Sequence, residues 1–323
     1  MSQEMRPYQV VGAPSSLGCK ASGAADGPRS LRESGLTALL ESLIRRGIPA
    51  IDTGDVDAPS GSGADSNPRN LSEFVAYSTS LMARLAQSYS AGACPVVIGG
   101  DHSISIPSVS AAAAALRGAR GDDAELGLVW VDAHPDLETP ETTPTGYLHG
   151  MAAAVLLGFG AEELVGLGGF RPKVRPENTA FIGLRDVLEC ERELIESRGM
   201  AAYTATDIER IGMAAVCDRV FRHMSDSVSG FVLSFDVDAC DPMEAPGVEY
   251  PERGGLTFRE AHLLAEYAAD ADGLMCVEVL EVIPELDRDH RSSQLAVSFL
   301  RSLILGKPVY RTTPPRYDRQ RRA

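Results

Sequence analysis

The sequence predicts an α/β protein built on a mainly parallel, doubly wound sheet whose strands end in polar residues. Runs rich in β-branched residues alternate along the chain with segments whose apolar residues recur at helical spacing. Repeated strand–helix units of this kind favour parallel pairing with helices on both faces. The runs at 95–98, 126–131 and 230–235 are each followed closely by Asp or His. Because ligand crevices of open α/β sheets lie at the carboxyl ends of the strands, we expect the functional site there.

Composition indicates one large domain and argues against several classes of partner. The 323 residues contain no polar low-complexity linker, so we expect one domain over residues 1–310, followed by a basic tail at 311–323. The tail is either disordered or an arm that binds a neighbouring subunit. The net charge of −15 argues against a nucleic-acid binder, which needs clustered Lys and Arg. Residues 1–8 lack a signal-peptide core and no run approaches the roughly 20 apolar residues of a membrane span, so we expect a cytoplasmic protein without membrane contact.

The first part of the chain supplies two strands and two helices. A β-branched strand at 10–14 runs into a glycine-containing loop, and apolar residues at helical spacing predict an amphipathic helix at 29–46. Residues 48–51 form a second strand, and its proline places it near a sheet edge because proline cannot donate to the ladder. Ser, Gly, Pro and Asp predict a surface loop at 57–70, before a helix with an apolar face at 71–90.

The alternation of strands and helices continues toward the C-terminal end. After the strand at 95–98, Gly99 and Gly100 let the backbone approach other segments closely. Further strands are predicted at 126–131, 179–184, 201–203, 230–235 and 275–280, and the short run 308–310 follows the last helix. Further helices are predicted at 106–116, 151–157, 189–197, 214–223, 258–267 and 294–305.

Residues at the strand ends form a candidate metal-ligand set. Side chains two apart on an extended chain point to one side, so the carboxylates and imidazole that follow residues 126–131 converge. A buried strand ending in a polar turn would explain one such cluster, but the pattern recurs after other strands. The full set comprises His102, Asp132, His134, Asp136, Asp236 and Asp238. Carboxylates and imidazoles without a thiolate suit Mn²⁺, with Fe²⁺, Co²⁺ or Zn²⁺ as alternatives. Such a set exceeds what one catalytic ion needs, so we expect two bridged ions and hydrolytic chemistry.

The motifs around these ligands resemble the metal motifs of the arginase/agmatinase (ureohydrolase) family. They read Gly-Gly-Asp-His-Ser at 99–103, Asp-Ala-His-Pro-Asp at 132–136 and Ser-Phe-Asp-Val-Asp-Ala-Cys-Asp-Pro at 234–242. Further similarity at 12–14, 183–186 and 281–284 extends the resemblance over nearly the whole chain. The resemblance implies a three-layer α/β/α fold with eight parallel strands, assembled as trimers or hexamers. It also implies hydrolysis of a C–N bond in a guanidino compound, through a hydroxide that bridges two manganese ions, with release of urea and an amine.

The resemblance assigns roles to individual residues. His102 and Asp136 would complete one manganese site and His134 and Asp238 the other, with Asp132 and Asp236 bridging. We place Asp136 in the catalytic set together with His149 and Glu281.

His149 takes the place of the family's proton-shuttling histidine, which passes a proton to the leaving amine. A histidine at a helix start without a catalytic task is the alternative. Glu281 matches the acidic residue that receives the guanidinium group. The remaining histidines, His223, His262 and His290, are expected to be structural or exposed.

The loops that hold the amino-acid part of arginine in arginases differ in this chain. Glu138 stands where arginases have a small polar side chain for the α-carboxylate, and Leu188 replaces an acidic contact to the α-amino group. Glutamate would repel a carboxylate, and leucine cannot bind a cation. We therefore expect a small guanidino or amidino substrate other than arginine. The expected substrate-binding residues are Glu138, Thr145, Tyr147, Leu188, Glu249, Tyr250 and Glu281, and a distal cation would meet Glu138, Glu189, Glu191 or Glu249.

The sequence leaves several alternatives open. If the substrate-binding loops of this chain align with those of arginases in a different way, the protein has arginase activity itself. Residues 139–148 resemble arginase-like hydroxyarginine hydrolases, and residues 287–293 resemble the formimidoylglutamase branch, which would act on a formimino group. A family member without turnover is a further alternative, because a fold alone does not determine function. Such proteins usually lose a ligand or the proton carrier, and this chain keeps both.

Overall fold

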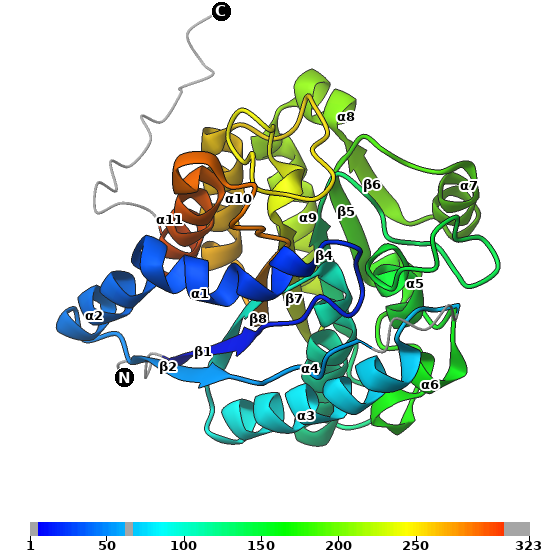
Figure 1. Cartoon of the computed structure of the whole chain (residues 1–323), viewed down its shortest axis with the longest axis horizontal. Coiled ribbons are helices and arrows are strands. Elements are labelled where there is room, and N and C mark those ends of the chain that lie inside the picture. Colours follow the sequence, from blue (N-terminus) through cyan, green and yellow to red (C-terminus); the bar gives the residue numbers. More distant parts are fainter. Residues whose placement is uncertain (1–5, 62–66, 307–323) are drawn as a thin grey trace, which may run out of the picture.

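The computed structural model describes residues 6–61 and 67–306, which form an eight-stranded parallel sheet covered by helices on both faces (Figure 1). The strand order is β2-β1-β3-β8-β7-β4-β5-β6. The strands are β1 (Tyr8–Ala13), β2 (Ala50–Asp55), β3 (Cys94–Gly99), β4 (Leu126–Val131), β5 (Thr179–Leu184), β6 (Ala201–Thr204), β7 (Gly230–Asp236) and β8 (Leu274–Leu280). The predicted three-layer α/β/α class is confirmed.

Two layers of helices enclose the sheet. One layer contains α1 (Gly27–Leu31), α2 (Thr37–Arg45), α8 (Ala205–Ile211), α9 (Met213–Ser227), α10 (Phe258–Asp270) and α11 (Arg291–Leu305). The other contains α3 (Leu71–Ser90), α4 (Ser105–Arg120), α5 (Ala152–Leu156), α6 (Glu162–Val165) and α7 (Glu189–Arg198). Within the described part of the chain, no helix is long and apolar enough to cross a membrane.

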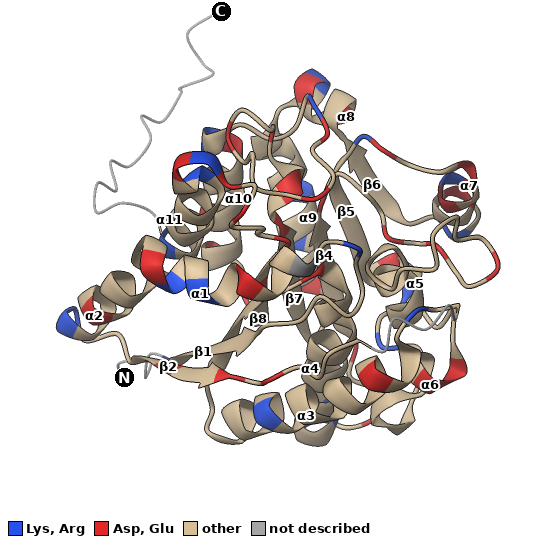
Figure 2. Cartoon of the chain, viewed as in Figure 1, with Lys and Arg blue, Asp and Glu red and all other residues tan. Residues whose placement is uncertain are grey.

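The hydrophobic core has two halves because successive strand side chains point to opposite faces of the sheet. On β4, Val129 and Val131 pack into one half, whereas Leu128 and Trp130 pack into the other. The central strands are therefore covered on both faces, which explains why they appear in the sequence as continuous apolar runs. Arg and Glu occur together on the surface helices α2 and α7 (Figure 2).

The structure departs from the predicted elements where the local signal is weak. The continuous helix expected at 29–46 is wrong, because a π-helical turn at Arg32–Leu36 separates α1 from α2 and Gly35 adopts φ 121° there. Glycine tolerates this conformation, and apolar spacing does not reveal it. The short helices α6 and α8 were not predicted, since they span about one or two turns. The strand predicted at 48–51 is found at a sheet edge as β2, but it spans Ala50–Asp55, so Pro49 precedes it and is not the reason for its edge position. Residues 308–310 and the basic tail lie outside the described residues.

The arrangement of the central strands decides where the site forms. Strands β3, β8, β7 and β4 are neighbours in the sheet and all run parallel. The segments that follow their carboxyl ends therefore meet at one edge of the sheet. These are the segments that carry the predicted metal ligands.

Candidate metal centre and cavity

His102 enters the site from the loop after β3. That loop lies close to the N-terminal loop: Gly100 has no side chain, and a Cβ there would clash with the Ser15 carbonyl oxygen. Asp101 supports the turn by accepting hydrogen bonds from the backbone N–H groups of Gly18 and Ser103, each at 3.0 Å. His102 is 1% exposed, and its Nδ1 atom has no hydrogen-bond partner among the described residues. This orphaned nitrogen is aimed at a group of carboxylates.

The carboxylates around His102 come from two neighbouring strands. Its Nδ1 atom lies 2.8 Å from Asp132 Oδ2, 3.2 Å from Asp136 Oδ2 and 3.1 Å from Asp236 Oδ2. Asp132 and Asp136 follow β4, whereas Asp236 ends β7. Asp136 adopts φ 50°, which is rare for a non-glycine residue and marks strain that the surroundings must maintain.

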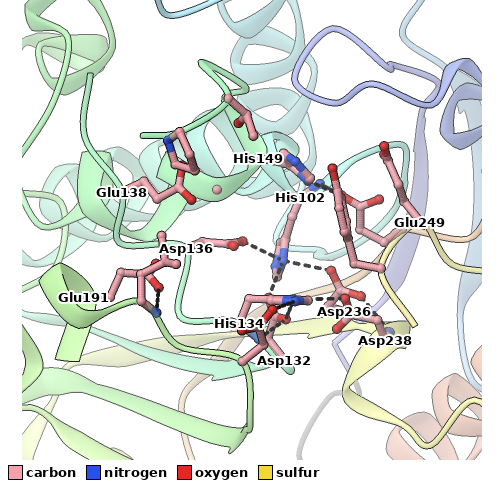
Figure 3. A pocket seen from close by; sticks show the side chains of 17 residues that line it. His102, Asp132, His134, Asp136, Glu138, His149, Glu191, Asp236, Asp238 and Glu249 are labelled. Carbon is pink, nitrogen blue, oxygen red and sulfur yellow. Dashed lines mark hydrogen bonds and ion pairs between the residues drawn. The ribbon is translucent and has the colours of Figure 1, made fainter. Parts of the chain in front are cut away.

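His134 gathers a second group beside the first. Its Nδ1 atom lies 3.3 Å from Asp132 Oδ1 and 3.2 Å from Asp238 Oδ2. Asp238 lies in a short 3₁₀ turn after β7, and Arg185 holds this turn by donating to the carbonyl oxygens of Asp238, Ala239 and Cys240. Asp132 thus contributes one carboxylate oxygen to each group, as a bridging ligand would (Figure 3).

The two groups fit a pair of divalent metal ions. His102, Asp132 and Asp136 offer ligand atoms within 4.8 Å of one another, and Asp132, His134 and Asp238 do the same. Ligand atoms bound about 2.1 Å from one ion at right angles would be about 3 Å apart, which is the spacing observed. The charges agree with this fit. Burial and the negative charge of neighbouring Asp132 raise the pKa of Asp136 to about 6. The crowded carboxylates therefore repel one another when they are ionised, and divalent ions would offset this repulsion.

His149 and Glu281 face each other beside these groups. His149 begins a short 3₁₀ turn before α5, and Glu281 directly follows β8 with φ 65°. His149 Nδ1 lies 3.3 Å from Glu281 Oε1, which also accepts a hydrogen bond from the His102 backbone N–H at 2.8 Å. Burial acts to lower the pKa of His149, but the Glu281 carboxylate raises it to about 9. The other Glu281 oxygen, Oε2, is buried and has no partner within the described residues.

A cavity above the ligand groups brings together most of the predicted substrate-binding residues. Its wall includes Glu138, Thr145, Leu188, Glu249, Tyr250 and Glu281, together with His149, Glu191 and the six predicted ligands. Figure 3 shows Glu138 and Glu191 on one side of the cavity and Glu249 on the other. Among the residues that the structure describes, its lining contains nine carboxylates and no Lys or Arg.

Other predicted residues do not reach the cavity. Tyr147 is absent from its wall and instead packs edge-on to His149, with ring centroids 6.2 Å apart. Glu189 is 70% exposed and pairs with Arg192. Of the three histidines expected to be structural or exposed, none lines the cavity; His262, for example, donates through Nδ1 to the Phe258 carbonyl oxygen at 2.7 Å.

Glu191 was predicted as a possible partner for a distal cation of the substrate, but its carboxylate binds the protein backbone instead. It is 4% exposed, and its two oxygens accept backbone hydrogen bonds from Leu137 and Leu188, each at 2.9 Å. Burial raises the pKa of Glu191 to about 7, and these two backbone groups oppose the rise. Both oxygens are engaged by the protein, so Glu191 fastens the start of α7 to the loop after β4.

Sequence reasoning missed Trp130, which supports two candidate ligands. Its indole ring stacks on the His102 imidazole with centroids 3.9 Å apart, and its Nε1–H donates to Asp132 Oδ2 at 3.1 Å. The sequence could have indicated this role, because Trp130 lies two residues before Asp132 and so points to the same side of the strand.

The fold and these ligand groups define a class: a metal-dependent hydrolase whose site lies at the carboxyl edge of a doubly wound parallel sheet. Comparison with known proteins narrows the class. The profile of the arginase family matches residues 6–306. An arginase from Brevibacillus brevis is 39% identical over 300 residues, covering 92% of this chain and 97% of the relative. An arginase from Bacillus subtilis is 38% identical over 305 residues, covering 94% and 99%.

Solved structures agree with these relatives. The native structure of Bacillus caldovelox arginase superposes with a TM-score of 0.88 at 36% identity, covering 94% of this chain and 100% of that one. Entamoeba histolytica arginase, in complex with L-ornithine, gives 0.83 at 26% identity, covering 93% and 98%. The chain therefore belongs to the arginase family. It is a ureohydrolase, a hydrolase that acts on C–N bonds other than peptide bonds.

Proposed function

We propose that this protein hydrolyses a guanidino compound other than arginine, releasing urea and an amine from a site that holds two manganese ions. One observation carries the proposal. Glu281 is 4% exposed and lines the cavity beside the two ligand groups, and its buried Oε2 atom has no hydrogen-bond partner among the described residues. Buried carboxylate oxygens are rarely left without a donor, and a guanidinium group supplies planar N–H donors that match one.

Each residue of the proposed site has a defined task. The two ions would be held by His102, Asp132, His134, Asp136, Asp236 and Asp238. When bound, the ions supply an activated water at neutral pH and polarise the electrophilic carbon. Glu281 would bind the guanidinium group and orient it beside the two ligand groups. His149 holds a proton, stabilised by Glu281, and gives it to the leaving amine as the C–N bond breaks.

The charge of the cavity supports a substrate without a carboxylate. Two divalent ions would balance the four aspartates, and the guanidinium would balance Glu281. Glu191 is engaged by backbone N–H groups and Asp186 Oδ2 lies 3.7 Å from His134 Nε2, so Glu138 and Glu249 remain available along the wall. One Glu249 oxygen accepts from the Ala21 backbone N–H at 3.2 Å, and Glu138 Oε2 is buried without a partner in the described chain. An α-carboxylate would face Glu138, whereas a second cationic group on the substrate would complement both glutamates.

Urea release tests the proposal across a panel of substrates. The Mn²⁺-loaded protein would be assayed with arginine, hydroxyarginine, agmatine, guanidinobutyrate, guanidinopropionate and guanidine, and formamide release from formiminoglutamate would be followed separately. We expect the highest kcat/KM for a substrate with a guanidino group and a distal cation. A preference for arginine would overturn the proposed substrate, and no turnover by verified metal-loaded protein would overturn the proposed reaction.

Substitutions inside and outside the cavity lining test which residues determine the substrate preference. Glu138→Asn with Leu188→Asp should raise kcat/KM for arginine relative to the preferred substrate, because repulsion is removed and an amine partner is added. Tyr147→Asn is the control, since Tyr147 lies outside the cavity lining and should change this ratio little. If the double variant keeps the original preference, the assignment of these residues to specificity is wrong.

Arginase activity is the second candidate. It is favoured by the curated relatives, which are named arginases and match nearly their whole length. The same substrate panel decides between the two candidates. On the family resemblance we further propose a trimeric or hexameric assembly and a cytoplasmic location.

A further inference from the structure

A chain of buried hydrogen bonds begins at the Nε2 atom of His102, the ring nitrogen that does not face the ligand carboxylates. His102 Nε2 lies 2.9 Å from Ser234 Oγ, and Ser234 Oγ lies 3.0 Å from Ser105 Oγ. Ser105 Oγ donates to Glu278 Oε2 at 2.6 Å. Glu278 is on β8, Ser234 is on β7 and Ser105 begins α4, so three separate elements contribute to the chain.

All four members are buried, with Glu278, Ser105 and Ser234 each 0% exposed and His102 1% exposed. A carboxylate in the middle of an apolar strand is costly, and burial raises the pKa of Glu278 while the serine hydroxyls act to lower it. Among the described residues, only Ser105, Ser234 and His102 act to lower its pKa, with no Lys or Arg among them, and its Oε1 atom has no hydrogen-bond partner. The packing of β8 alone would be served better by an apolar residue. The position of Glu278 therefore calls for another explanation.

The chain determines which nitrogen of His102 carries the proton. The Ser105 hydroxyl donates to Glu278 Oε2, and this direction holds while Glu278 is ionised, because an ionised carboxylate only accepts hydrogen bonds. The Ser105 oxygen is then free to accept the single proton of Ser234. Ser234 in turn must accept from His102 Nε2–H. With the proton on Nε2, the lone pair of Nδ1 faces the carboxylates of the first ligand group.

We propose that Glu278 is a positioning residue for the metal centre, acting through Ser105 and Ser234 to keep His102 in the tautomer that binds a cation through Nδ1. This inference rests on the proposed metal-dependent function. Partners of this kind, beyond the direct ligands, typically change metal affinity by about 10–100-fold when they are removed. Glu278 accepts a hydrogen bond from Ser105 and not from a direct ligand, so its effect on His102 passes through the two serines.

Metal binding measured without catalysis tests the proposal. Chelator-stripped protein would be titrated with MnCl₂, and free Mn²⁺ would be quantified by its EPR signal. We expect Ser234→Ala and Glu278→Met each to weaken one of two binding events by about 10–100-fold and to leave the other unchanged. Glu278→Gln should restore most of the affinity, because its amide oxygen still accepts from Ser105. A merely structural glutamate would not produce this pattern of loss and recovery.

Two further variants complete the design. Ser110→Ala is the matched control: Ser110 is on α4 and 0% exposed like Ser105, but its hydroxyl has no partner among the described residues, so Mn²⁺ affinity should be unchanged. The double variant Ser234→Ala/Glu278→Met should bind no more weakly than either single variant, since both changes interrupt one chain. Ser105→Ala replaces Ser234→Ala if thermal unfolding shows that the latter does not fold.

The outcomes separate this inference from the proposed function. If the wild-type protein binds two Mn²⁺ and His102→Ala loses one, but Ser234→Ala and Glu278→Met bind like the wild type, the positioning role is wrong and the metal function stands. If the wild-type protein binds no Mn²⁺, or His102→Ala keeps both sites at full affinity, the proposed metal centre itself is wrong. Additive losses in the double variant would also contradict a single connected chain.

Discussion

Glu191 offers the sharpest test of how the cavity wall is held together. The substitution Glu191→Gln keeps the size of the side chain but replaces one acceptor oxygen by an NH₂ donor. Both carboxylate oxygens accept backbone hydrogen bonds in the native protein, from Leu137 and Leu188. One of these N–H groups must therefore face another donor in the variant, at a site that is 4% exposed.

The cost follows from that unpaired backbone donor. A buried polar group left without a partner costs about 1–3 kcal/mol in the free energy of unfolding. At this chain length each kcal/mol lowers Tm by about 2 °C, so we expect Tm to fall by roughly 2–6 °C. The assay is calorimetry of the chelator-stripped protein at a pH above the Glu191 pKa of about 7, where the carboxylate is ionised and metal binding cannot mask the change.

Glu189→Gln provides the control for the Glu191→Gln measurement. Glu189 begins the same helix but is 70% exposed and pairs with Arg192 at the surface, so Tm should change little. An unchanged Tm in Glu191→Gln, combined with a higher KM for a cationic substrate, would refute our reasoning. Glu191 would then be a substrate ligand, as the sequence alone allowed.

Three further predictions concern the centre and its supports. His134→Ala should abolish urea release and remove one Mn²⁺ per subunit in metal analysis, because the second ligand group loses its imidazole. Gly100→Ala should destabilise the protein by about 3 kcal/mol in thermal unfolding, since the added Cβ would clash with backbone that cannot move freely. In the chelator-stripped protein, the NMR titration of His149 should give a pKa of about 9, and Glu281→Gln should lower it. The pKa of His149 rises on folding from the ordinary histidine value of 6.5 to about 9, so between these pH values the folded protein binds one more proton than the unfolded chain. This stabilisation is therefore complete below about pH 6.5 and is lost as pH rises through about 9.

Each of these predictions has a control or a contradicting result. Full activity in His134→Ala would exclude the assigned centre. For Gly100→Ala the control is Gly118→Ala, where a Cβ meets no atom within 4 Å and α4 should gain about 0.5–1 kcal/mol. If Glu281→Gln leaves the pKa of His149 unchanged, the ion pair does not set the charge of His149.

The sequence determined most of the elements and the residue types that gather at the candidate site. Apolar runs and helical spacing predicted the strands and most helices, because each such pattern arises from the local geometry of one element. The period-two spacing of Asp132, His134 and Asp136 placed three side chains on one side of the chain. The break at Gly35 was not predictable in this way, since a single positive φ leaves no mark on the apolar pattern.

Only the tertiary structure decided how these residues are used. Strand order brought β3, β8, β7 and β4 together, which placed Glu281 beside His149 although 132 positions separate them in the chain. Packing turned Glu191 toward backbone N–H groups and left Tyr147 outside the cavity wall, where residue type alone had placed both at the substrate. It also connected Glu278 to His102 across three elements. Residue type limits which bonds a side chain can make, but its direction and partners depend on contacts between segments far apart in sequence.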